Sequence, residues 1–298
     1  MLYEFALDPQ LVYRVTESRR NFIDFIRCFS IGTPAVVSDF PKIKHFRRQV
    51  LSDLDDDLPE SQKTMVEEVL KFLSESPRVK RCTDYNSGND WKSNVLKENE
   101  RIPFDVVVCA TSGMNIGEIT LEDMHEGYPD YPRQVLVQRV AKKITGAIEN
   151  MLRLSTKIVF VDPYFSADDK NWIPFIKFVE VAETEQPVGR LDIEVLFRKG
   201  ARGISADLVI KFKENHSDLL AGCNVTFKQI KERKNQEIIH NRYVLTDIGG
   251  ASFGVGLGEE AITASDEVTL LEESVYELRW NQYAEMNGFV ICEETSCI

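Results

Sequence analysis

A histidine, an arginine and an aspartate stand close together in the segment HNRYVLTD, residues 240–247. An imidazole can attack a phosphorus centre or protonate a leaving oxygen. A guanidinium is a permanent cation whose fork of donors matches phosphate oxygens. The apolar residues around Arg242 predict a strand over 238–245, in which His240 and Arg242 would lie on one face. The segment therefore predicts an anion-binding pair.

Asp247 falls on the other face of the alternation, beyond the predicted strand end, and the turn Gly249-Gly250 follows it. Two roles fit this position, because the carboxylate can turn back towards an imidazole or cap the turn. A second His-x-Arg pair, His45 and Arg47, lies in a predicted helix and has Ser52 where the matching spacing requires Asp. We therefore interpret that pair as a surface charge cluster.

The elements around this segment alternate between strands and helices, which indicates an α/β sheet packed on both faces. Ligands of such open sheets usually bind at the carboxyl ends of the strands, so the loops at those ends are the candidate site. The predicted strands are 157–161, 191–197, 224–230, 238–245 and 251–257, and the predicted helices are 168–182, 204–215 and 274–283.

The N-terminal part of the chain has a different periodicity of apolar residues. Apolar residues recur at helical spacing over 11–29, 42–54 and 61–74, with one short strand predicted at 104–110. A further helix is predicted over 134–154. We therefore expect two domains: a mainly helical region of unknown role over residues 1–130, and the α/β domain over residues 131–298.

The spacing His-x-basic-x4-Asp resembles the signature of the phospholipase D superfamily. The context is also similar, because a strand ends in Asp162-Pro163-Tyr164 and a glycine-rich strand follows Asp247. The acidic segment 265–268, which contains Glu267, lies where many members carry a polar or acidic residue. The resemblance extends over residues 134–290 and implies a phospholipase D-like mixed sheet with flanking helices.

The resemblance also implies a chemistry. In active members a histidine forms a phosphohistidine, and a second histidine from another repeat or subunit protonates the leaving oxygen. Carried over, His240 would be nucleophile or acid, Arg242 would clamp the non-bridging oxygens, and Asp247 would support the site. No metal or cofactor is expected. Because the chain holds one half-site, we expect a homodimeric phosphodiesterase, a nuclease of the kind that recurs in prokaryotic defence systems.

Arg242 stands where the family usually has lysine, and a planar fork holds phosphate differently from an ammonium. The arginine form is similar to the phospholipase D-like domain attached to MIT modules, which is thought to bind phosphoinositides without cleaving them. The alternative is therefore a non-catalytic module that recognises a phospholipid headgroup, nucleic acid or a protein partner such as an ATPase.

Other residues near the expected strand ends allow two interpretations each. Asp162 and Tyr164 fit either the pocket floor or a strand-terminating turn. Arg198 and Lys199 follow a predicted strand, where they either bind a polyanion or are solvated loop charges. The glycines over 249–258 match neither a P-loop nor a dinucleotide fingerprint, so they indicate a turn and a bulged strand or a close approach to phosphate.

Composition sets limits on partners and location. The 298 residues carry a formal net charge of -12, so nucleic acid and anionic lipid are repelled on average and need a local basic patch. The six cysteines are scattered without a CxxC pair, as in free thiols of a reducing cytosol. No run approaches the roughly 20 apolar residues of a membrane span, and the start lacks a basic leader. We expect a cytoplasmic protein.

Overall fold

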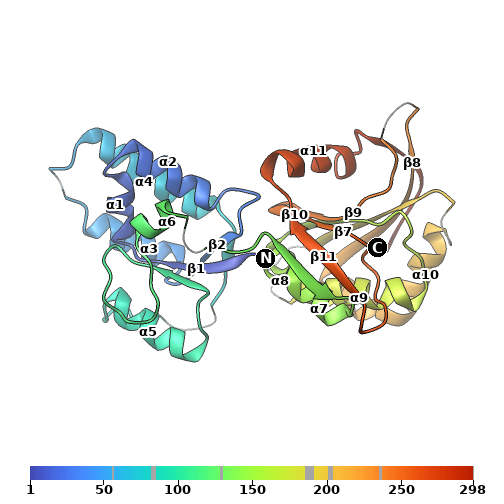
Figure 1. Cartoon of the computed structure of the whole chain (residues 1–298), viewed down its shortest axis with the longest axis horizontal. Coiled ribbons are helices and arrows are strands. Elements are labelled where there is room, and N and C mark those ends of the chain that lie inside the picture. Colours follow the sequence, from blue (N-terminus) through green and yellow to red (C-terminus); the bar gives the residue numbers. More distant parts are fainter. Residues whose placement is uncertain are drawn as a thin grey trace. The chain divides into compact units, whose positions relative to one another are not determined.

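The computed structural model in Figure 1 describes residues 1–55, 57–81, 85–127, 130–184, 191–200, 204–234 and 237–297. These residues form a mixed α/β structure with one parallel and one mixed sheet. The chain divides into two compact units, one of residues 2–131 and one that comprises Met1 and residues 132–298. Each unit has its own sheet and is described by itself.

The N-terminal unit contains a parallel sheet with strand order β3-β2-β1-β4. Its strands are β1 (Tyr3–Leu7), β2 (Ala35–Ser38), β3 (Arg78–Val79) and β4 (Val106–Val108). The expectation of a mainly helical region missed this sheet, although strand 104–110 corresponds to β4. The reason is length, because strands of two to five residues are too short for an alternating pattern to stand out.

Helices cover both faces of this sheet. Alternate side chains of β1 point to opposite faces, so Phe5 and Leu7 pack among residues of α1 to α4, while Ala6 packs with Trp91 and Val95 of α5. The helices are α1 (Leu11–Thr16), α2 (Arg19–Cys28), α3 (Ile43–Ser52), α4 (Glu60–Glu75), α5 (Trp91–Arg101) and α6 (Leu121–His125).

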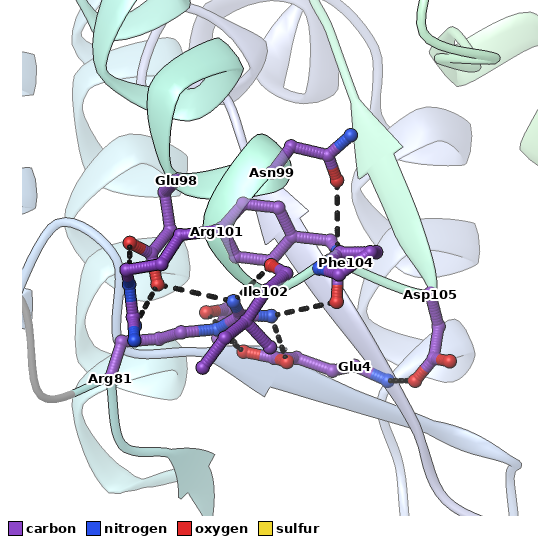
Figure 2. A network of polar contacts seen from close by, with 10 residues as sticks. Glu4, Arg81, Glu98, Asn99, Arg101, Ile102, Phe104 and Asp105 are labelled. Atoms are coloured by element: carbon purple, nitrogen blue, oxygen red, sulfur yellow. Dashed lines mark hydrogen bonds and ion pairs between the residues drawn. The ribbon is translucent and has the colours of Figure 1, made fainter.

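A buried ion-pair network ties β1 to α5 (Figure 2). The Arg81 guanidinium lies 2.5 Å from a Glu4 carboxylate oxygen and 3.2 Å from one of Glu98. It also donates to the carbonyl of Ile102 at 2.6 Å and lies 3.9 Å from the Phe104 ring centroid. Paired and hydrogen-bonded in this way, the charges can be buried. The network therefore fixes α5 and the segment before β4 against the sheet.

The C-terminal unit contains a mixed sheet with strand order β12-β8-β7-β6-β9-β10-β11-β5. The strands β6, β7 and β8 are parallel, and every other neighbouring pair is antiparallel. The bounds are β5 (Gln134–Gln138), β6 (Lys157–Val161), β7 (Leu191–Arg198), β8 (Cys223–Glu232), β9 (Arg242–Thr246), β10 (Gly249–Phe253), β11 (Ser265–Leu270) and β12 (Phe289–Cys297).

The helix predicted over 134–154 was wrong in its first part, because that part is the edge strand β5. Val135 and Val137 are two residues apart, which is the period of a strand, whereas the helical spacing begins later. The remainder forms α7 (Ala141–Ala147) and α8 (Glu149–Leu154).

Both faces of the second sheet are covered, because alternate residues of β6 pack in opposite directions. Phe160 packs on Phe178 of α9 (Asp169–Glu183), with ring centroids 5.4 Å apart. Val159 and Val161 share a core cluster with Tyr276 and Tyr283 of α11 (Glu273–Tyr283). On the α9 side, α10 (Ser205–His216) continues into the short 3-10 helix η1 (Ser217–Ala221).

No helix in the described ranges has the length and apolar character that a bilayer crossing needs.

A candidate anion-binding site

Charged residues converge at the end of the second sheet where β6 finishes and β9 begins. Val161, the last residue of β6, pairs with Tyr243 of β9, so Asp162 and Arg242 lie at the same edge. A cleft of about 580 Å³ opens there. Its lining includes the basic residues Arg139, Lys170 and Arg242, the acidic residues Asp162, Asp168 and Glu260, and Tyr164, Ser166, Asn171 and Gly256.

Arg242 is the notable cation of this cleft. Its guanidinium carbon lies 5.0 Å from the centroid of the Tyr164 ring, whose residue is 55% exposed. Its Nε is buried without a hydrogen-bond partner. Among the residues that the structure describes, none forms a hydrogen bond or ion pair with this side chain. An unpaired buried donor is costly, and the described residues leave the donors of this guanidinium without a hydrogen-bond partner.

Arg139 lies in the same cleft but is held by the protein. Only 5% of it is exposed, its Nη2 donates to the Gly258 carbonyl at 2.7 Å, and its Nη1 lies 3.5 Å from the Glu260 carboxylate. Lys170 also contacts that carboxylate. The sequence interpretation missed Arg139, because the residues around it were assigned to a helix. The alternation of Val135 and Val137 immediately before it was the available signal.

Asp162 forms the floor of the cleft. The residue is 3% exposed, and its carboxylate accepts hydrogen bonds from the backbone N–H groups of Tyr164 at 3.0 Å and Leu257 at 3.4 Å. Burial raises the pKa of the Asp162 carboxyl, against the opposing effects of these bonds and of Arg242 and Arg139. The Asp162 carboxyl therefore lies beside Arg242 with its oxygens turned to backbone N–H groups.

The loop after β10 is shaped by a second buried carboxylate. Asp266 is 3% exposed and accepts from the backbone N–H groups of Val255 at 2.9 Å and Gly256 at 3.4 Å. Gly256 has a φ of +148°, and a Cβ built on it would lie 3.9 Å from Arg242 Nε. Glycine is required here for this backbone conformation. Asp266 thus holds the loop that forms one wall beside the guanidinium.

His240 does not lie in a strand, because β9 begins at Arg242 and not at residue 238. The predicted arrangement of His240 and Arg242 on one strand face is therefore wrong. The imidazole is exposed in the preceding connection and lines a second, smaller cleft of about 330 Å³. Glu267 and Ser252 line this cleft too, and Arg242 contributes to both clefts. The Glu267 carboxylate accepts a hydrogen bond from Gln134 at 2.7 Å.

The structure does not bring Asp247 to these residues. Asp247 follows the last residue of β9, at the opposite end of the strand from Arg242. Its carboxylate accepts hydrogen bonds from the backbone N–H of Thr156 at 3.1 Å and from the Thr156 hydroxyl at 2.5 Å. Its observed role is to join the end of β9 to the start of β6.

Arg198 and Lys199 lie beside the larger cleft without lining it. Arg198 ends β7 and forms an ion pair with Glu232 at 3.1 Å. The Lys199 backbone N–H donates to Ile230 at 2.8 Å, and its side chain is exposed. The next residue, Gly200, does line the cleft. Arg198 is therefore engaged by the protein, while the Lys199 side chain stays in solvent.

No cluster of three or more histidine, cysteine or carboxylate side chains suited to a metal ion occurs in the described part of the chain. Comparison with protein-family models found no match, and comparison with curated proteins found none either. One solved structure with some similarity is TrmBL2, an archaeal chromatin protein whose structure is described as showing a novel mode of DNA binding. The match has 12% identity and a TM-score of 0.29, and it covers 76% of this chain and 67% of that one.

Proposed function

We propose that residues 132–298 bind a phosphate-bearing ligand in the cleft at Arg242. The observation that carries this proposal is the state of the Arg242 side chain, which lines the cleft, lies over Tyr164 and has no hydrogen bond or ion pair to the described residues. A guanidinium offers five donors in a planar fork, which suits phosphate oxygens. The ring beneath it fixes its orientation before a ligand arrives.

The other charges of the cleft support this assignment. Glu260 is paired with Arg139 and Lys170, and Asp162 directs its oxygens to backbone N–H groups. These carboxylates are therefore engaged by the protein, whereas the Arg242 donors are not. In a chain with a net charge of -12, a cation fixed in a concave site is what attracts a phosphate locally.

Binding can be tested directly with two probes, a labelled single-stranded oligonucleotide and a soluble inositol phosphate. We expect one or both to bind, and Arg242→Gln to weaken that binding by at least about tenfold, since a charge-assisted hydrogen bond contributes about 1.5–3 kcal/mol. Lys213→Gln is the matched control, because it removes one charge from the exposed surface of α10. Equal affinities of wild type and Arg242→Gln would refute the proposal.

A second candidate function, a metal-independent phosphodiesterase, is favoured by one observation. His240 and Arg242 line the same smaller cleft, so a phosphodiester bound by Arg242 in that cleft would have an imidazole among its neighbours. The imidazole nitrogen would form a bond to phosphorus as the bond from phosphorus to the leaving oxygen breaks, and that oxygen would take a proton from a second His240 in a homodimer. Water, deprotonated by the second imidazole, would then attack the phosphorus and release the first imidazole. A phospholipase D-like fold for this unit is part of this proposal.

Hydrolysis of oligonucleotides in EDTA distinguishes the two functions. Cleavage by wild type but not by His240→Gln, with ligand affinity retained in the variant, would establish the phosphodiesterase. If a protein shown to be dimeric binds the oligonucleotide but does not cleave it, the result supports the binding function and contradicts the phosphodiesterase.

A further inference from the structure

Another cleft of the C-terminal unit, separate from the two clefts at Arg242, lies among helices α7, α8 and α9. It has a volume of about 530 Å³ and shares no lining residue with the clefts at Arg242. Four basic side chains line it, and they come from all three helices: Lys142, Lys143, Arg153 and Lys177. Two carboxylates, those of Glu149 and Glu180, line it as well.

The carboxylates hold two of these cations in place. Glu149 pairs with Arg153 at 2.6 Å, and Glu180 pairs with Lys177 at 2.8 Å, each within one helix. Lys142 and Lys143 differ, because their exposed ammonium groups form no hydrogen bond or ion pair within the described ranges. Four cations against two carboxylates leave the cleft positive in a chain that is acidic overall.

Two small residues of α7 add features that packing does not explain. Thr145 is 2% exposed, and its buried hydroxyl has no hydrogen-bond partner among the described residues. Buried hydroxyls normally find a partner. Gly146 follows it, and a Cβ built there meets nothing within 4 Å. Glycine is a poor helix former, so this position leaves open space in the cleft at the expense of helix stability.

We propose that this cleft is a binding site for a compact anion that carries phosphoryl groups, such as an inorganic or organic pyrophosphate. The two unpaired lysines supply charge, the two held cations define the walls, and the Thr145 hydroxyl offers a donor to a phosphoryl oxygen. The space at Gly146 admits the anion close to the helix backbone. A concave site among three helices favours a small anion over a flat lipid surface.

The test uses the full chain carrying Arg242→Gln, so that the first cleft does not contribute. Titration of this protein with inorganic pyrophosphate by calorimetry should show one site. In the same background, changing Lys142 and Lys143 together to glutamine should weaken binding at least about tenfold. Thr145→Val should weaken it about fivefold without loss of folding, because the side chains have the same shape. Lys213→Gln should leave it unchanged.

Gly146→Ala separates ligand binding from folding. The added methyl group improves helix propensity and should raise the melting temperature by about 2 °C, while it occupies the open space and weakens pyrophosphate binding. The proposal would be overturned if the Arg242→Gln chain did not bind pyrophosphate, or if its affinity for pyrophosphate were unchanged by the substitutions at Lys142, Lys143, Thr145 and Gly146. Binding to vesicles of anionic phospholipid without binding to pyrophosphate would overturn it as well. These results are independent of whether the cleft at Arg242 binds phosphate.

Discussion

The carboxylate of Asp247 holds Thr156 by two hydrogen bonds, to the backbone N–H at 3.1 Å and to the hydroxyl at 2.5 Å. Thr156 directly precedes β6, whose other end leads into Asp162. Asp247 and Arg242 flank opposite ends of β9, so two members of one sequence motif act at opposite edges of the sheet. The aspartate aligns the strand pair that carries the site.

Asp247→Ala is expected to lower the free energy of unfolding by about 1–2 kcal/mol, because Thr156 loses its acceptors at a partly exposed position. Ligand affinity at the Arg242 cleft should change less than twofold. Urea denaturation and anisotropy titrations of the same preparations measure the two quantities. A large loss of affinity at unchanged stability would instead place Asp247 in the site.

Asp266 is a positioning residue for the same cleft, because it holds the N–H groups of Val255 and Gly256. Asp266→Asn replaces one acceptor oxygen by an NH2 group, so the loop wall should loosen and affinity should fall about fivefold. The dependence of oligonucleotide affinity on salt should stay unchanged, since no phosphate-contacting cation is lost. Arg242→Gln should reduce that slope by about 0.7. If Asp266→Asn and Arg242→Gln changed the salt dependence of affinity equally, the positioning role of Asp266 and the phosphate-binding role of Arg242 would be contradicted.

Arg81→Met should destabilise the N-terminal unit by about 3–5 kcal/mol, because the buried Glu4 carboxylate loses its ion pair and the buried Glu98 carboxylate loses one of its guanidinium partners. Combining Arg81→Met with Glu4→Gln should recover part of this loss. Arg101→Gln is the comparison and should cost less, since the Arg101 side chain is 43% exposed and Glu98 keeps Arg81 as a partner when Arg101 is removed. Urea denaturation followed by fluorescence, with Trp91 as the reporter in this unit, checks these values.

Glu118 is expected to make the N-terminal unit sensitive to acid. Burial acts to raise its pKa, but hydrogen bonds from the backbone N–H groups of Gly113, Met114 and Ile116 outweigh it and hold the pKa at about 2. A carboxyl whose pKa is lower in the folded state stabilises it above the ordinary value of 4.5. That contribution is lost as the pH falls from 4.5 towards 2. Melting curves of Glu118→Gln should show a smaller decline over this interval.

The longer elements of the C-terminal unit could be predicted from the sequence. The strand expected at 191–197 is β7, the helix expected at 168–182 is α9, and both patterns persist long enough to separate period 2 from period 3.6. For Asp162 and Tyr164 the sequence left two interpretations open, a pocket floor or a strand-terminating turn, and in the structure both residues line the cleft with Arg242. Short elements were the failures, as β1 and β2 show.

The candidate site depended on details that periodicity does not fix. The first residue of β9 determines the position of His240, which would lie on a strand face if β9 began at residue 238 but lies in a connection because β9 begins at Arg242. Apolar residues occur both before and after Arg242, so the sequence pattern does not show where the strand begins. Arg139 directly follows the edge strand β5, and it reaches the cleft through its hydrogen bond to Gly258, a residue more than 100 positions later in the chain. Such pairings arise from sheet order, which no local pattern encodes.

The residues at the two ends of strand β9 have different roles, and this difference has a consequence for how the protein can change in evolution. At one end of β9, Asp247 joins β9 to β6. At the other end, many of the residues that line the cleft with Arg242 lie in loops outside the strands. The connections can therefore be exchanged, lengthened or recharged while the ladder stays in register. A scaffold of this kind lets the loops at one end of the sheet change in length and charge without a new core.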